Sequence, residues 1–233
     1  MASPERYFFL HLQKTAGTAL WRRLNEVNDP AALYPGPGDG SPPLTTLSVD
    51  HLLERWAERR HEIRIVAGHF PLCTTELLDA TFRTFTVLRD PVERTLSFLR
   101  HHKQTAPEDA ERSLESIYED PLRQQLVVNH MTKMLSMTTD EMTGGALSPI
   151  EADDAHISRA CERLGEVDVV GIQERFDEFC AALEHRFSWS LGKTRFMNRT
   201  QPVEVTERFR RRIAADNEPD RIIYEEACRL QNS

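Results

Sequence analysis

The feature that most constrains this chain is an apolar strand that runs directly into a turn of small residues and then into a helix. Residues 7–12 are suited to a buried strand, and the turn that follows contains Lys14, Gly17 and two threonines, Thr15 and Thr18. The amides of this turn can point at an anion on the positive end of the helix, and the lysine adds a full charge beside it. The turn is therefore predicted to bind a phosphate group.

The order of residues in this turn indicates which kind of phosphate-containing ligand it would bind. A nucleoside-triphosphate loop reads G-x-x-x-x-G-K-[ST], whereas here Lys14 comes before Gly17. The string instead resembles the 5′-phosphosulfate loop of sulfotransferases that use 3′-phosphoadenosine 5′-phosphosulfate (PAPS), whose carbohydrate-type members carry H-x-P-K-T-x-G-T. Gln13 replaces the family's proline. The resemblance implies that the donor is held by Lys14, Thr15, Ala16, Gly17, Thr18 and Ala19.

A second motif follows the buried, β-branched run at residues 84–88. Pro91 suits the first turn of a new helix, which puts Arg89 at the strand end and Ser97 about two helical turns along. A guanidinium and a hydroxyl can converge there on one phosphate. The spacing resembles the family's 3′-phosphate site. The alternative is that Arg89 and Asp90 cap the helix and pair with each other at the surface.

Between the two motifs, a third strand ends in Gly68 and His69. In the related uronosyl 2-O-sulfotransferases a histidine of such a pair is the catalytic base, so the resemblance nominates His69. An ordinary imidazole is largely neutral near pH 7 and can accept a proton from a hydroxyl. Lys14 would be its catalytic partner, stabilising charge on the departing 5′-phosphate. The alternative is a structural histidine, the role that we expect for His11.

Later segments extend the resemblance to the end of the chain. Residues 129–135 are similar to the family's N-x-x-T-x-x-L segment in the active-site wall, and residues 170–176 are similar to V-G-x-x-E-R-F. Residues 195–200 lie where the family places a late loop that closes on the nucleotide. This nominates three nucleotide contacts, with a solvated loop as the alternative: Asn198, Arg199 and Thr200.

Alternating strand and helix patterns predict the fold. We expect one sulfotransferase domain over residues 1–233, with a P-loop-like, three-layer α/β architecture in which helices flank a central parallel sheet. Residues 28–46 are rich in Pro and Gly and read as a long loop that could cover the acceptor, with residues 136–147 shaping the same pocket. Helices are expected within residues 122–135 and from Ser148, which stands before a proline and three residues before a glutamate.

Charge and composition exclude several classes of function. The net charge of −8 argues against nucleic-acid binding and weighs against a long polyanionic substrate. No apolar run approaches the roughly 20 residues of a membrane span, and the first residues lack the design of a signal peptide. The four cysteines form no C-x-x-C pair, so neither a zinc site nor a disulfide scaffold is indicated. We expect a bacterial cytoplasmic protein without a metal.

These observations lead to a hypothesis of sulfuryl transfer from PAPS to an acceptor hydroxyl. The acceptor would be a sugar, a glycolipid or a small natural product, and the residue types do not choose among them. Two rivals remain open. A small-molecule kinase would prefer ATP with Mg²⁺, and a catalytically silent nucleotide-binding module would lack a working base.

Overall fold

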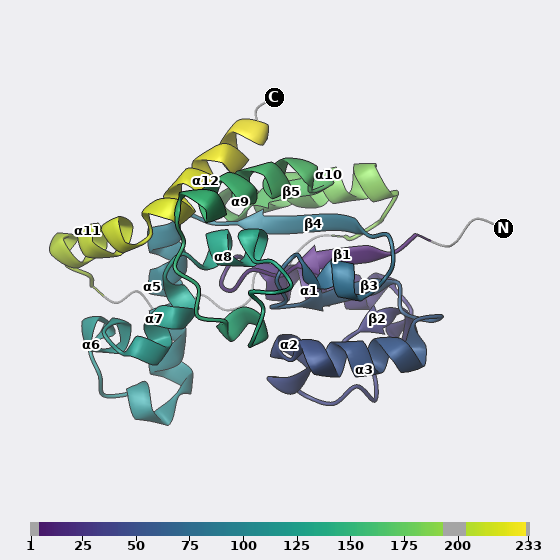
Figure 1. The fold of residues 1–233 in the computed structure, drawn as a ribbon, viewed down its shortest axis with the longest axis horizontal. Coiled ribbons are helices and arrows are strands. Elements are labelled where there is room, and N and C mark those ends of the chain that lie inside the picture. Colours follow the sequence, from purple (N-terminus) through teal and green to yellow (C-terminus); the bar gives the residue numbers. More distant parts are fainter. Residues whose placement is uncertain (1–4, 193–203, 232–233) are drawn as a thin grey trace.

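The computed structural model describes residues 5–192 and 204–231 (Figure 1). Five strands form one sheet in the order β2-β3-β1-β4-β5, and every neighbouring pair is parallel. The strands are β1 (Tyr7–Leu10), β2 (Leu33–Tyr34), β3 (Ile65–Gly68), β4 (Arg83–Leu88) and β5 (Val169–Ile172).

The central strand shows why the sheet is covered on both faces. All four residues of β1 are buried, and successive side chains point to opposite faces of a strand. Phe8 and Leu10 therefore join one apolar cluster, while Tyr7 and Phe9 join another. A strand that is apolar on both sides is typical of a parallel sheet between two helical layers.

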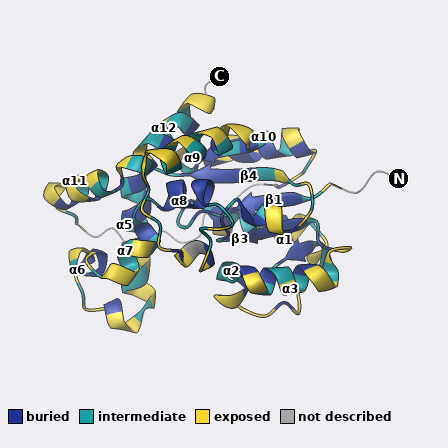
Figure 2. Cartoon of the chain, in the orientation of Figure 1, coloured by how far each residue is buried: buried dark blue, intermediate teal, exposed yellow. Residues whose placement is uncertain are grey.

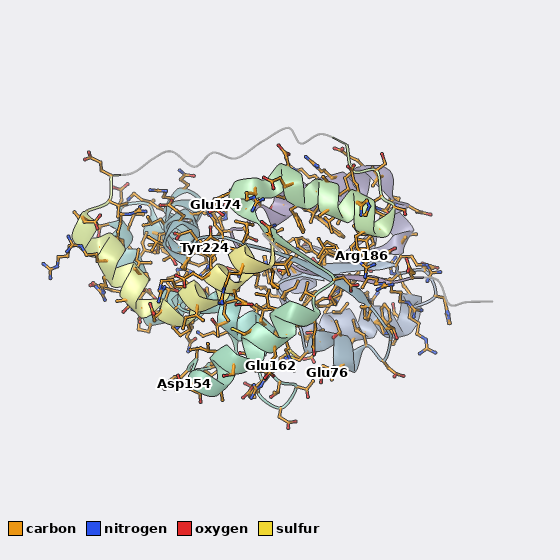
Figure 3. The ribbon with its side chains drawn as sticks, turned by 90° about the horizontal axis from the view of Figure 1, so that it is seen from above. Glu76, Asp154, Glu162, Glu174, Arg186 and Tyr224 are labelled. Carbon is orange, nitrogen blue, oxygen red and sulfur yellow. The ribbon has the colours of Figure 1, made fainter. Side chains whose placement is uncertain are left out.

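The helices follow this division, and Figure 3 shows the sheet between two helical layers. The second cluster packs α1 and α10 on one face, whereas the first packs α3, α8 (His130–Ser136), α9 and α12 on the other. The α/β architecture with a central parallel sheet is thereby confirmed. The longer helices are α1 (Gly17–Val27), α3 (Val49–Arg59), α5 (Pro91–Thr105), α9 (Asp154–Glu166), α10 (Phe176–Phe187), α11 (Glu207–Asp216) and α12 (Glu218–Leu230).

A third cluster lies beyond the carboxyl ends of the strands (Figure 1). It packs α5 against α6, α7 and α11 around Leu96, Phe98, Ile117 and Phe209. Figure 2 shows the strands buried and the outer faces of the helices exposed. No helix of the described residues is long and apolar enough to cross a bilayer. The shorter helices are α2 (Leu44–Leu47), α4 (Thr74–Leu77), α6 (Leu114–Tyr118), α7 (Pro121–Val127) and α8 (His130–Ser136).

The Pro- and Gly-rich segment at residues 28–46 differs from the expected loop. It contains the edge strand β2 and reaches the short helix α2. The buried carboxylate of Asp39 accepts a hydrogen bond from the amide of Gly36 at 2.7 Å and pairs with Arg59 of α3 at 2.8 Å. The ring of His51 lies 2.7 Å from the carbonyl of Asp39. These contacts hold the segment against α3.

Of the two helix predictions in the middle of the chain, the one for residues 122–135 is confirmed and the one for Ser148 is wrong. The pattern over residues 122–135 is two helices, α7 and α8, because Asn129 adopts a left-handed conformation with φ of 51° between them. Ser148 does not begin a helix. Its hydroxyl accepts from the amide of Gly144 and donates to the carbonyl of Gly145, closing a turn, and the cap of α9 is Asp153, whose carboxylate accepts from His156 N at 2.9 Å.

Candidate active site

The sheet order brings three strand ends together. β1 lies between β3 and β4, with Leu10 opposite Gly68 on one side and Thr86 on the other. The chain leaves β1 toward β2 and β3 and later crosses to β4, so the sheet changes direction beside β1. In open α/β sheets such a point, at the carboxyl ends of the strands, is where ligands bind. The predicted phosphate loop, Arg89 and His69 all follow these three strands.

The loop after β1 leaves the start of α1 open to an anion. Lys14 and Ala16 adopt left-handed conformations with φ of 66° and 69°, and the buried Thr15 hydroxyl ties the turn to Leu12 O at 2.9 Å. Within the described chain no side chain caps α1 at Ala16, and its first turn has no acidic residue. The first amides of a helix have no partner inside it, so this end suits a phosphate group. Thr18 is exposed in the first turn of α1, and Ala19 follows it.

Gly17 is required by its contact with a histidine. A Cβ atom at this position would lie 2.0 Å from two atoms of the His11 ring. That ring stacks on Phe9 with a centroid distance of 5.1 Å and lies 4.4 Å from the ring of His69. The glycine therefore lets α1 start directly against the imidazole, which supports the structural role expected for His11.

Arg89 contacts the loop after β1. Its Nη1 donates to the carbonyl of Lys14 at 3.1 Å. Asp90 does cap the next helix, accepting from Glu93 N at 2.9 Å, but Arg89 turns to the loop instead of pairing with it. Ser97 lies half-buried in α5, and no hydrogen bond of its hydroxyl is found among residues 5–192 and 204–231.

His69 is held with one ring nitrogen ready to accept a proton. Its Nδ1 lies 2.6 Å from the carbonyl oxygen of His11. A carbonyl only accepts, so Nδ1 carries the hydrogen and Nε2 of the neutral ring keeps its lone pair. Burial lowers the pKa of His69, which keeps the ring neutral near pH 7. This is the state that a general base needs.

Comparisons with solved structures find several neighbours, among them a sulfotransferase. The crystal structure of a sulfotransferase from Alicyclobacillus acidocaldarius resembles this chain with 16% identity and a TM-score of 0.49. The alignment covers 94% of this chain and 93% of that one. No protein-family model matches the chain, and no curated protein does.

Sequence reasoning missed a third histidine at this site. The Nε2 atom of His130, the first residue of α8, accepts a hydrogen bond from the amide of Gln13 at 3.2 Å. Burial, followed by the charge of Arg94, holds the pKa of His130 well below its ordinary value. The neutral ring thus fixes the loop from the side of α8. The residue falls in the segment predicted to form the site wall, but no sequence signal pointed to this bond.

Positive charge gathers around the loop despite the acidic composition. Burial, and then the neighbouring Arg89, lower the pKa of Lys14. Burial also lowers the pKa of Arg89, opposed by Glu174, Glu93 and Asp90. In the described part of the chain no carboxylate lies within ion-pair distance of Lys14. A bound dianion would favour the charged lysine, since opposite charges in a half-buried site attract strongly.

Three of the predicted nucleotide contacts belong to the late loop at residues 195–200. Asn198, Arg199 and Thr200 lie outside the described residues. Metal ligands were not expected, and no group of three or more His, Cys, Asp or Glu side chains suited to a metal ion occurs in the described ranges. The residues brought together are thus cations, amides and neutral imidazoles, which suit a phosphorylated nucleotide and a proton transfer.

Proposed function

We propose that this protein is a sulfotransferase that uses PAPS and moves its sulfuryl group to an acceptor hydroxyl. One observation supports this proposal most strongly, and it has three features. Lys14 has no carboxylate partner in the described chain, and it lies beside the uncapped start of α1. The neutral ring of His69 is close to both. The first two features suit the 5′-phosphate side of the donor, and the third suits activation of a hydroxyl.

Each residue would have a distinct part in the reaction. Lys14 and the amides at the start of α1 would stabilise the charge that grows on the 5′-phosphate. Nε2 of His69 would take the acceptor proton. Arg89 and Ser97 would hold the 3′-phosphate and so distinguish the donor from ATP, with Asn198, Arg199 and Thr200 as further nucleotide contacts. The donor supplies an activated sulfuryl group, and we propose that transfer needs no metal.

The location and domain organisation are part of the same proposal. All four cysteines are free, and free thiols are typical of a reducing compartment, so we infer a bacterial cytoplasmic enzyme. We also infer that residues 1–233 act as one catalytic domain.

The deciding experiment is calorimetric titration with 3′-phosphoadenosine 5′-phosphate (PAP), ADP, and ATP with Mg²⁺. PAP should bind best, since it alone carries the 3′-phosphate. Arg89→Gln and Ser97→Ala should lower the affinity for PAP and leave that for ADP nearly unchanged. Arg89 also contacts the loop, so equal losses for both nucleotides would mean damage to the loop rather than a 3′-phosphate site. Preference for ATP with Mg²⁺ would instead establish the kinase.

A second experiment separates an enzyme from a silent nucleotide-binding module. His69→Ala should leave PAP affinity unchanged and lower kcat by about 10²- to 10⁴-fold, the usual contribution of a general base. His61→Ala, at an exposed histidine before β3, is the matched control. Turnover that survives His69→Ala in a folded protein would remove His69 as the base.

A further inference from the structure

A hollow of about 440 Å³ lies between α2, the start of α3 and the segment before α9. One wall is formed by α2 and the start of α3, and the other by residues 139–147, with Leu77 at the end of α4 between them. The far wall belongs to the segment 136–147 that the sequence suggested for the acceptor pocket, whereas of the other suggested segment, residues 28–46, only Pro43 and Leu44 line the hollow. The volume is within the usual range for a small-molecule site.

One wall of the hollow is connected to the candidate base by a backbone hydrogen bond. The backbone amide of His69 donates to the carbonyl of Thr46 in α2 at 2.8 Å, and the next residue, Leu47, lines the hollow. This bond joins the wall to the end of β3. The hollow therefore borders the segment that is hydrogen bonded to the His69 backbone, and an acceptor held there would have to extend past this segment to reach the His69 ring.

The far wall is held in place by contacts that do not involve a ligand. The sulfur of Met142, which lines the hollow, lies 3.7 Å from Thr74 Oγ1 of α4. The carboxylate of Glu141 accepts from the Thr138 amide at 2.8 Å and pairs with Arg159 of α9 at 3.2 Å. Because contacts with α4 and α9 hold Met142 and Glu141 in place, the far wall keeps its position without a ligand.

The lining selects against charge. Its apolar side chains include Leu44, Leu77 and Leu147, which are 50%, 40% and 43% exposed. Among the residues that line it, Asp50 is the single charged one, and none is Lys, Arg or His. A sulfated or carboxylated acceptor would lose its hydration there without gaining a cation, which is costly. An apolar molecule would cover leucines that now face water.

We propose that this hollow holds the acceptor and that the acceptor is an uncharged, apolar alcohol or phenol. This rests on the sulfotransferase function proposed above. In the reaction the acceptor oxygen bonds to sulfur as its proton passes to His69 Nε2. The bond from sulfur to the 5′-phosphate oxygen breaks, and its electron pair leaves on PAP. The products are a sulfate ester and PAP.

The test compares three hydroxyl compounds with the full chain: 2-naphthol, its anionic analogue 6-hydroxy-2-naphthoate, and the neutral sugar methyl glucoside. Binding is measured by saturation-transfer NMR without a donor, and sulfation is measured with PAPS. We expect 2-naphthol to bind and react at least about tenfold better than either of the others, a difference of roughly 1.4 kcal/mol.

Two substitutions that introduce a positive charge test whether 2-naphthol binds in the hollow. Leu77→Lys and Leu147→Lys place a cation at exposed positions of the rim, so the fold should be kept. Each should weaken 2-naphthol binding about tenfold and leave PAP affinity unchanged. Leu122→Lys in α7 is the matched control, because Leu122 is 59% exposed and does not line the hollow.

The outcomes separate this inference from the proposed function. Loss of 2-naphthol binding in both rim variants, but not in the control, supports an apolar acceptor in the hollow. Equal binding by wild type and rim variants overturns it, as does preference for the sugar or the anion. In those cases intact PAP binding would leave the sulfotransferase function standing. Failure of PAP binding would reject that function, whatever 2-naphthol does.

Discussion

At the scale of single residues, the candidate site depends on close contacts among three aromatic rings and on one glycine. The rings of Phe9, His11 and His69 form a row in space. The centroids of the first two are 5.1 Å apart, and those of the last two are 4.4 Å apart. Gly17 closes this arrangement because nothing larger fits beside His11. The carbonyl of His11 also sets the tautomer of His69. One histidine backbone and one glycine thus position both the anion site and the base.

Gly17→Ala should destabilise the fold and weaken PAP binding. The new Cβ would overlap the His11 ring, and overpacking of this kind typically costs about 1–3 kcal/mol. The double variant Gly17→Ala with His11→Ala should recover most of the loss, since it removes the ring that clashes. Urea unfolding of the four proteins measures this coupling. Additive effects in the double variant would contradict the contact.

The buried histidine of α8 should make stability depend on pH. The folded pKa of His130 lies well below the unfolded value of about 6.5. Below that pH the unfolded chain binds the extra proton, so the free energy of unfolding falls as pH falls, by up to about 1.4 kcal/mol per pH unit for this group. His130→Gln keeps an acceptor for Gln13 and should reduce this slope in urea melts between about pH 7 and pH 5, with the remainder due to His11 and His69, whose pKa values are lowered as well. An unchanged slope would show that other groups dominate.

At the scale of elements, one carboxylate joins three helices. Asp220 of α12 is fully buried, and burial raises its pKa. It nevertheless accepts from the amides of Met131 and Thr132 at 3.1 Å and 2.7 Å, at the start of α8, and lies 3.9 Å from Arg94 of α5. Since α8 also carries His130, this contact keeps that ring on the phosphate loop.

Asp220→Ala should therefore cost far more than loss of a surface carboxylate. Removing it leaves Arg94 without its carboxylate partner and the start of α8 without its acceptor, for a loss of about 3–5 kcal/mol. Glu225→Ala removes an exposed carboxylate of the same helix, paired with Arg221, and should cost at most about 1 kcal/mol. Thermal unfolding of both variants provides the comparison. Similar losses would mean that Asp220 does not join the helices.

At the scale of the whole molecule, sheet order decides where chemistry can occur. β1 lies between β3 and β4, so the loops that follow these strands meet although their residues are far apart in sequence. The chain as a whole has more acidic than basic residues, with a net charge of −8. Nearby charges outweigh distant ones at ordinary ionic strength, so the Lys14 and Arg89 pair can still attract a dianion.

Ligand binding should therefore raise thermal stability selectively. A ligand at a hundred times its Kd adds about 2.7 kcal/mol to the native state, and each kcal/mol shifts Tm by about 2–4 °C for a chain of this size. At equal concentration PAP should raise Tm more than ADP, and the shift should persist in EDTA. A larger shift with ATP that disappears in EDTA would favour the kinase.

The sequence determined the local parts of this protein. Apolar and β-branched runs predicted strands β1, β3, β4 and β5, since strands buried on both faces are largely apolar. Pro91 marked the start of α5, and the spacing of Lys14 and Gly17 predicted the loop before α1. These features depend on neighbours within a few residues, which a sequence displays directly.

Tertiary structure decided whatever depends on distant partners. Edge strand β2 has two residues, too few for a pattern, and forms because β3 supplies its hydrogen bonds. The helix expected at Ser148 is absent because its hydroxyl bonds within the turn at Gly144 and Gly145. The bond from Gln13 to His130 spans 117 residues, and the hollow needs α2 and residues 139–147 to meet. No local pattern encodes such contacts, because packing between remote segments creates them.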